Sequence, residues 1–202
     1  MDKNVIIIGA GGHGRVICDT VLSCGDNVVG FIDENKEAKV EGFEYLGDMS
    51  VIKKYPDCCF IIAIGNNMVR EIIAKDHSEL DYYTAIHPSA VVSHSAKIGK
   101  GSCIMPHATI NSCASIGMHC IINSNAVVEH DCKIADFVHL SPGAVACGTV
   151  SIGRLSHIGA GTSIKNNIAI CEKVTIGAGA AVVNDISEPG TYVGVPVHRI
   201  EK

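Results

Sequence analysis

The residues best suited to chemistry are a histidine and an aspartate that follow one another, His130 and Asp131. A histidine titrates near neutral pH, so a neutral imidazole at position 130 can accept a proton from a reacting group. The adjacent carboxylate can accept a hydrogen bond from one ring nitrogen and so fix the tautomer. Gly148 lies one coil further along the repeat described below, and we expect its exposed backbone N–H to stabilise a developing oxyanion. These three residues are the predicted catalytic group.

A second group of residues could hold a phosphate. The stretch GAGGHG at residues 9–14 follows an apolar strand expected at 5–8 and precedes a helix expected at 15–24, and a second strand, 28–32, ends at Asp33. This order is typical of a mononucleotide-binding unit, because glycines let backbone N–H groups approach a phosphate and a helix N-terminus favours its charge. Asp33 can accept hydrogen bonds from a ribose or a base. A single glycine motif is weak evidence, so a purely structural turn is the alternative.

The remaining elements expected before the solenoid complete a small α/β domain. They are a short strand at 44–46, a helical turn at 50–54, a strand at 60–64 that ends in Gly65-Asn66-Asn67, and a helix at 68–75. A dinucleotide fold needs two βαβαβ halves, and this stretch supplies one. We therefore predict a half-Rossmann domain over residues 1–84 that binds one nucleotide, or a nucleotide that carries a sugar, rather than NAD.

Almost half of the chain carries an apolar residue at every sixth position, a period that neither an α-helix nor a simple strand predicts. These residues are Ile86, Val92, Ile98, Ile104, Ile110, Ile116, Ile122, Val128, Ile134, Leu140, Ala146, Ile152, Ile158, Ile164, Ile170, Ile176 and Val182. The pattern is the hexapeptide repeat of a parallel β-helix, with about 18 residues in each triangular coil. Coils stack about 4.8 Å apart. Ile104, Ile122 and Leu140 should then lie above one another, and His139 should stack on His157.

Two other features of the repeat carry predictions. At four glycines that follow apolar positions we expect the backbone to turn sharply: Gly99, Gly117, Gly153 and Gly177. One face is polar but uncharged, which favours a surface for partner subunits and above all a homotrimer. That face carries Asn111, Ser112, Asn123, Ser124 and Asn125.

Composition excludes several classes of function. The formal net charge of the 202 residues is −5, which argues against a nucleic-acid-binding surface. No apolar run reaches the length of about 18 residues that a membrane span needs, and the short run at 5–8 is not typical of a signal peptide. The 10 cysteines form no C-x-x-C pair. We expect packing roles for them in a reducing cytoplasm, with Cys120 and Cys132 in small-residue positions of the repeat.

Several motifs together resemble one family over essentially the whole chain. They are GAGGHG, the strand end FID at 31–33, the turn AIGNN at 63–67, VVEHD at 127–131 within the solenoid, and GVPV at 194–197. This combination resembles the bacterial nucleotide-sugar acetyltransferases of the bacillosamine and perosamine type, to which sialic-acid-cluster O-acetyltransferases are related. The resemblance implies a homotrimer, a left-handed parallel β-helix over residues 85–202 with a C-terminal tail, acetyl-CoA bound between subunits, and no metal.

The resemblance also implies roles for individual residues. His130 matches the general base, and Asp131 matches an acidic neighbour that is glutamate in some members. His139 and Gly148 match positions at the acetyl thioester and pantetheine, and Ala160 and Ala178 match backbone contacts to coenzyme A. The positions that match the nucleotide-sugar pocket are Gly11, Gly12, His13, Asp33, Glu34 and Gly65, with Asn123 near the sugar. Glu34 departs from the aspartate of some members, which leaves the base of the nucleotide open.

The predicted reaction is direct transfer of an acetyl group from acetyl-CoA to the amino group of a nucleotide-linked 4-amino-deoxy sugar. One alternative differs only in the acceptor, a hydroxyl of a sialic acid or another sugar. A remote alternative is a γ-type carbonic anhydrase, for which His130, His139 and His157 are the available zinc ligands, although no two histidines are five residues apart. A nucleotide sensor without enzymatic activity is a third, and the His130–Asp131 pair argues against it.

Overall fold

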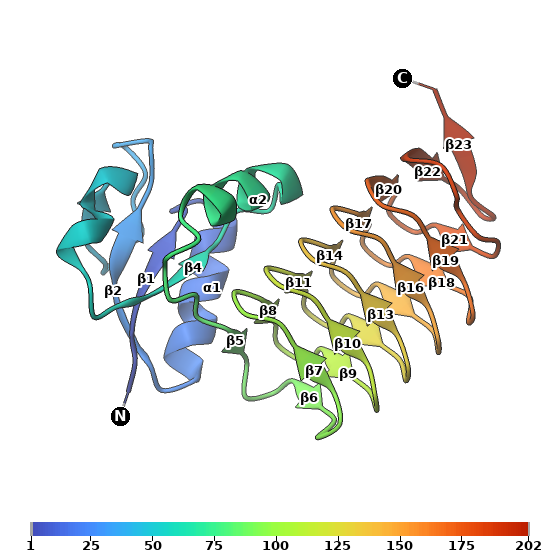
Figure 1. Ribbon diagram of the computed structural model, residues 1–202, viewed down its shortest axis with the longest axis horizontal. Helices are drawn as coiled ribbons and strands as arrows, with labels where there is room; N and C mark the ends of the chain where they lie inside the picture. The colour runs from blue at the N-terminus through green and yellow to red at the C-terminus, as the bar shows by residue number, and fades with distance from the viewer. Residues whose placement is uncertain (1, 202) are drawn as a thin grey trace.

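The computed structural model describes residues 2–201. Its N-terminal part is a four-stranded parallel sheet in the order β3-β2-β1-β4 (Figure 1). The strands are β1 (Asn4–Ile8), β2 (Asn27–Ile32), β3 (Tyr45–Gly47) and β4 (Cys59–Ile62). Successive residues of β1 are buried on opposite faces of the sheet. This double burial explains why the strand is an unbroken apolar run.

Helices cover both faces of this sheet. Helix α1 (Gly12–Ser23) packs on the face that carries Val5 and Ile7. The 3-10 helix η1 (Met49–Lys54) and helix α2 (Asn67–Asp76) belong to the opposite face, with Ile6 and Ile8. The predicted half-Rossmann arrangement is therefore confirmed, although several bounds differ. The strand expected at 60–64 ends at Ile62, and the first helix differs at its start. It begins at Gly12 instead of residue 15, so the last three residues of GAGGHG form its first turn.

Residues from Ala85 onward form the predicted parallel β-helix, a row of stacked coils that runs away from the N-terminal sheet (Figure 1). The face that contacts the N-terminal part, here called the docked face, consists of β5 (Ala85–Ile86), β8 (Cys103–Ile104), β11 (Ile121–Ile122), β14 (His139–Leu140), β17 (His157–Ile158), β20 (Val174–Ile176), β22 (Gly190–Val193) and β23 (His198–Ile200). The last two strands pair antiparallel.

Two further faces complete the prism. The second face consists of β6 (Val91–Val92), β9 (Thr109–Ile110), β12 (Val127–Val128), β15 (Val145–Ala146), β18 (Ser163–Ile164) and β21 (Ala181–Val182). The third face consists of β7 (Lys97–Ile98), β10 (Ser115–Ile116), β13 (Lys133–Ile134), β16 (Ser151–Ile152) and β19 (Ala169–Ile170). Within residues 2–201, no helix is long and apolar enough to cross a membrane.

The stacking register matches the sequence repeat. Ile122 pairs with Ile104 below it and with Leu140 above it, and His139 pairs with His157. From Ile104 onward the inner core contains the apolar residue of each hexad and most of the small residues two positions earlier, including Cys120 and Cys132 at 0% exposure. Val92 and Ile98 are partly buried, and Ile86, the first residue of the predicted repeat, is 37% exposed and lies outside this core. All 10 cysteines are free thiols.

The role predicted for the four glycines is wrong. The left-handed corner residue lies elsewhere, and at ten corners it is not glycine; Asp131 (φ 61°) is one of these residues. Gly99, Gly117 and Gly153 are needed instead for close approach between coils, because an added Cβ would collide with the coil above. Gly177 is similar, with its Cβ 2.8 Å from Val193 Cγ1.

This corrected role predicts the effect of a glycine substitution. Gly153→Ala should lower the free energy of unfolding by about 1–3 kcal/mol, as is usual for overpacking a core. Its Cβ would meet the backbone of Cys171 and Glu172, which a side-chain rotation cannot relieve. Chemical unfolding would measure the loss, with Ser151→Ala on the same coil as the control, expected within about 0.5 kcal/mol of wild type. Equal stability of the two variants would contradict this packing role.

Candidate active site

His130 and Asp131 form a hydrogen-bonded pair at the edge between the second and third faces. His130 Nδ1 lies 2.8 Å from Asp131 Oδ2, and the two side chains are 59% and 58% exposed. A carboxylate only accepts hydrogen bonds, so the ring proton of a neutral His130 lies on Nδ1 and the lone pair lies on Nε2. The pair therefore holds a largely exposed imidazole with its lone pair on Nε2, as a general base requires.

Gly148 belongs to the coil that follows that of His130, and the His130 imidazole covers it. The residue is buried, so the expectation that its backbone is exposed is wrong. A Cβ built on Gly148 would lie 2.6 Å from His130 Nε2, which shows that the ring covers the glycine. Among residues 2–201, the Gly148 N–H has no hydrogen-bond acceptor. Its role as an oxyanion donor stays a prediction, while its role in making room for the ring follows from the geometry.

Three other histidines form a stacked row between the N-terminal part and the docked face. The His13 ring lies 6.5 Å from the His139 ring, and the His139 ring lies 4.7 Å from that of His157. Asn123 Nδ2 donates to His139 Nε2 at 3.1 Å, because Asn123 Oδ1 already accepts from the Ser124 N–H. His157 Nε2 lies 2.8 Å from Ser141 Oγ. The row brings together His13, His139 and Asn123 from the predicted site.

Burial holds these imidazoles in the neutral form. Burial, and to a smaller extent the Arg70 charge, lowers the pKa of His13 to about 4. Burial first, then His157, Arg70 and His13, lowers the pKa of His139 to about 3, although the Gly65 backbone acts in the opposite direction. The same two causes, burial and Arg70, lower the pKa of His157.

These shifts predict that the protein loses stability in mild acid. The unfolded chain protonates its histidines near pH 6.5, whereas folded His13 and His139 protonate near 4 and 3. Between these values the unfolded state binds more protons, so the free energy of unfolding falls as the pH falls. The stabilisation that comes from keeping His13 and His139 neutral is therefore fully present above about pH 6.5 and is lost as the pH falls below it. Urea unfolding at pH 7 and pH 5 should show a smaller difference for His139→Asn than for wild type. If His139→Asn and wild type lose the same stability between pH 7 and pH 5, the lowered pKa of His139 is not the cause of the acid sensitivity.

Asp33 holds the glycine loop in place. Asp33 Oδ2 accepts from the Ala10 N–H at 2.7 Å and Oδ1 accepts from the Asn35 N–H at 2.9 Å. A pocket of about 340 Å³ opens beside it, lined by Gly9, Asp33, Glu34 and Ile64 among others. A second pocket of about 270 Å³ lies on the other side of the 64–65 turn, against His157. Gly11, the N-cap of helix α1, and Gly12, its first residue, are both exposed.

The predicted site residues fall into three places in one chain. His130, Asp131 and Gly148 lie on the edge opposite the docked face, and His13, Asn123, His139 and the 64–65 turn lie at that face. Ala160 and Ala178 are exposed and stacked on the edge between the docked and second faces, where the Gly179 N–H donates to Ala160 O. A single chain therefore does not place His139 beside Gly148.

The same separation bears on the zinc alternative. His139 and His157 stack on the docked face, and His130 lies on the opposite edge. In the part of the chain that the structure describes, no group of three His, Cys, Asp or Glu side chains could hold a metal ion.

Comparison with known proteins gives one match to the N-terminal part and others to nearly the whole chain. The family model described as the PglD N-terminal domain matches residues 4–77. A histidine-to-asparagine mutant of perosamine N-acetyltransferase from Caulobacter crescentus, solved in complex with CoA and GDP-perosamine, is 32% identical to this chain. The match covers 98% of this chain and 97% of that one, with a TM-score of 0.94. This chain belongs to the perosamine and bacillosamine family of sugar N-acetyltransferases.

Other members of the family match as well. The acetyltransferase domain of PglB from Neisseria gonorrhoeae, solved with acetyl coenzyme A, is 33% identical over 99% of this chain and 100% of that chain, with a TM-score of 0.92. The UDP-N-acetylbacillosamine N-acetyltransferase of Bacillus subtilis is 42% identical over 111 residues, 51% of each protein. The chain thus spans about half the length of the curated relatives it matches.

Proposed function

We propose that this protein transfers the acetyl group of acetyl-CoA to the amino group of a nucleotide-linked 4-amino-deoxy sugar. One observation carries the proposal: the His130–Asp131 pair presents a free Nε2 at a solenoid edge, in a fold that matches a CoA- and sugar-nucleotide-bound relative over 98% of the chain. A positioned general base is typically worth about 10²–10⁴ in rate.

The chemistry needs only groups that the chain and its two substrates supply. His130 Nε2 accepts a proton from the attacking amine, while Asp131 holds the resulting imidazolium through Nδ1. The amine nitrogen bonds to the thioester carbon, and the C–S bond then breaks. The coenzyme A thiolate leaves and takes up the proton from His130. No acyl-enzyme is formed, and no metal takes part.

The N-terminal part would hold the nucleotide sugar. We assign residues 1–84 to this domain and residues 85–202 to the acetyltransferase domain. The pocket beside Asp33 and Glu34 suits a base and ribose, and the exposed amides of the glycine loop suit a diphosphate. His13, Asn123 and Gly65 then lie on the path towards the sugar, and His139 lies at the far end of that path.

A complete site would need two copies of the chain. The base lies on the edge opposite the nucleotide-sugar pocket, so a neighbouring solenoid has to bring the two together. The polar residues expected on one face lie instead on the two edges of the second face, Asn111 after β9 and Asn123 after β11. We propose a homotrimer that packs through this second face, where Val91 is 64% exposed and Val127 and Val145 are partly exposed. Coenzyme A would lie in the cleft between solenoids, along Ala160 and Ala178. Sedimentation equilibrium should give three times the 21.2 kDa chain mass; a monomer would contradict this assembly.

The acceptor and the location also belong to the proposal. The free cysteines and the use of acetyl-CoA support a cytoplasmic protein. An assay that detects thiol release would test UDP-, GDP- and dTDP-linked 4-amino sugars, with free sialic acid as the hydroxyl acceptor. We expect turnover with one of the amino sugars and none with sialic acid. Turnover with sialic acid alone would favour the O-acetylation alternative.

The glycine loop gives a prediction that separates binding from folding. A Cβ on Gly11 meets nothing within 4 Å, and its φ of −77° suits any residue. Gly11→Val should therefore fold and assemble, but fill space reserved for the diphosphate. We expect a KM for the nucleotide sugar raised about tenfold or more, because each 1.4 kcal/mol lost in binding is tenfold. The KM for acetyl-CoA should not change. An unaltered KM for the nucleotide sugar would show that the glycine loop is not part of the binding site.

A further inference from the structure

Helix α2 buries three polar side chains besides Ala74 and leaves large apolar side chains exposed. Asn67, Arg70 and Glu71 are buried, whereas Met68 and Ile72 are 62% and 55% exposed. Arg70 is only 1% exposed. Within residues 2–201, no carboxylate is among its hydrogen-bond partners. Burying a guanidinium in this way is costly unless its donors are satisfied, so the arrangement needs a specific reason.

The Arg70 guanidinium joins the N-terminal part to two coils of the solenoid. Its Nε donates to His119 O at 2.8 Å and its Nη2 donates to Phe137 O at 3.1 Å, one coil above. Nη2 also donates to Asn67 Oδ1, and Asn67 Nδ2 donates to Leu155 O on the third coil. The two side chains thus bond the carbonyls of equivalent corner residues in three consecutive coils.

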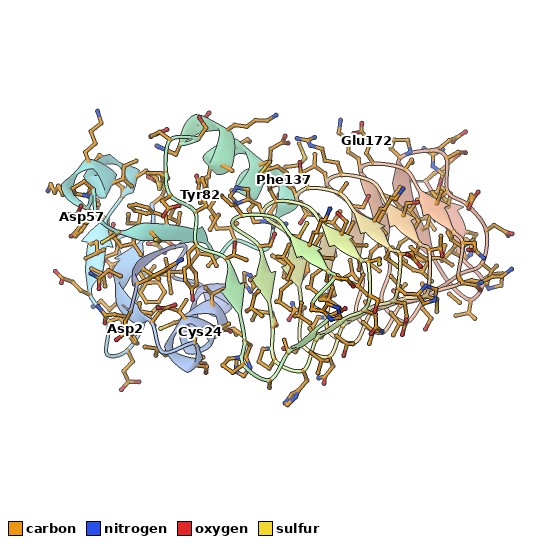
Figure 2. All side chains as sticks on the ribbon, turned by 60° about the horizontal axis from the view of Figure 1, so that its bottom comes forward. Asp2, Cys24, Asp57, Tyr82, Phe137 and Glu172 are labelled. Carbon is orange, nitrogen blue, oxygen red and sulfur yellow. The ribbon has the colours of Figure 1, made fainter. Side chains whose placement is uncertain are left out.

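Aromatic packing surrounds the same contact. His119 lies between Tyr82 and Phe137, with ring centroids 4.5 Å and 5.2 Å away. Figure 2 shows Tyr82 and Phe137 at the junction between the N-terminal part and the solenoid. Glu71 extends the junction by an ion pair with Arg154. The N-terminal part and the solenoid are therefore joined here by packed aromatic rings and by an ion pair, in addition to the hydrogen bonds of Arg70 and Asn67.

The other end of Arg70 holds a turn of the candidate nucleotide-sugar pocket. Its Nη1 donates to Ile64 O at 2.9 Å and to Gly65 O at 3.3 Å. The Gly65 backbone lies beside His139, the imidazole on which His13 stacks. One side chain thus fixes both the turn and the solenoid coils that the turn must face.

We propose that Arg70 and Asn67 are positioning residues for acetyl transfer, which set the nucleotide-sugar pocket at a fixed place on the solenoid. The proposal rests on the proposed function. The sugar amine is carried by the N-terminal part, while the thioester and the base are carried by the solenoids. A displacement of about 1 Å between reacting groups can cost about 10²-fold in rate. We call these contacts of Arg70 and Asn67 the clamp. Loosening the clamp should lower kcat more than it weakens the binding of either substrate.

The test compares Asn67→Ala and Arg70→Lys with Asp76→Asn, a control at an exposed position of the same helix. Asn67→Ala removes the bonds to the third coil, and Arg70→Lys keeps the charge but cannot bond both coils and the turn. We expect kcat to fall at least tenfold in both, with each KM within about threefold of wild type and the control unchanged. Amide hydrogen exchange, without substrate, should rise over residues 64–70.

Other outcomes would overturn the proposal. Unchanged hydrogen exchange would show that the clamp does not hold the junction. Faster exchange with an unchanged kcat would show that the two residues have only a structural role. The same would follow if both KM values rose while kcat stayed the same. If Arg70→Lys fails to fold, Asn67→Ala carries the test, because it retains the guanidinium. A wild-type protein without turnover on any sugar would instead overturn the proposed function, and the exchange data would still decide the clamp.

Discussion

Replacing His130 with alanine is expected to lower kcat at least about 100-fold, the usual contribution of a positioned general base. The amine must lose a proton as it attacks the thioester, and Nε2 of His130 is the free nitrogen that the Asp131 hydrogen bond leaves available. The KM for acetyl-CoA should change little, because the ring acts in the transition state more than in binding. Steady-state measurement of both substrates separates these parameters.

The solenoid offers a matched control for this variant. His94 is exposed on the same edge, two coils below His130. His94→Ala removes the same imidazole from the same kind of corner and should leave kcat within about twofold of wild type, as expected when no transition-state contact is lost. Near-normal turnover of His130→Ala, or equal losses in both variants, would show that His130 is not the base.

Gly148→Ala is expected to have the second largest effect, a fall of about 10²-fold in kcat. Its Cβ would lie 2.6 Å from His130 Nε2 and 2.7 Å from Cε1, so the ring must leave its position. Displacing a catalytic group by about 1 Å is sufficient for a loss of this size. The crystal structure of the variant should show the imidazole rotated away from Asp131.

Ser112→Ala provides the comparison, because Ser112 lies on the same edge, one coil below His130. This substitution introduces no atom beneath the ring and should leave kcat unchanged. Full activity of Gly148→Ala with an undisturbed ring would contradict the close packing on which this prediction depends.

The solenoid could be predicted from the sequence because its period is local and strict. Inward residues repeat every hexad, so Ile104, Ile122 and Leu140 could be placed above one another without knowledge of the rest of the fold. The glycine loop and the position of Asp33 can also be predicted, because the strand, the turn, the helix and the acidic residue follow one another closely in the chain. Asp131 could be paired with His130 for the same reason.

Contacts between coils and between the two parts were not accessible in this way. The burial of Gly148 depends on a ring that comes from a residue 18 positions earlier and folds over it, so its predicted exposure was wrong. The sequence pattern alone places Gly153 in a turn, although the collision that requires a glycine there comes from the coil above.

Arg70 and Asn67 were missed for a related reason. Amphipathic patterning predicts that the apolar side of a helix faces the core, and here Met68 and Ile72 face outwards. The signal available in the sequence was an asparagine and an arginine three residues apart, directly after the AIGNN turn. These two polar residues are buried because they donate to the solenoid carbonyls of His119, Phe137 and Leu155, which the helix pattern alone does not reveal.

The most direct test of the acetyl-transfer account is a crystal structure with coenzyme A and the nucleotide-linked amino sugar bound together. We expect the sugar amine to lie within hydrogen-bond reach of His130 Nε2, about 2.6–3.2 Å, with the thiol beside it. The nucleotide should lie in the glycine loop of a neighbouring copy. A thiol bound far from the His130 imidazole, or an amine that reaches no histidine of the solenoid edge, would contradict the account.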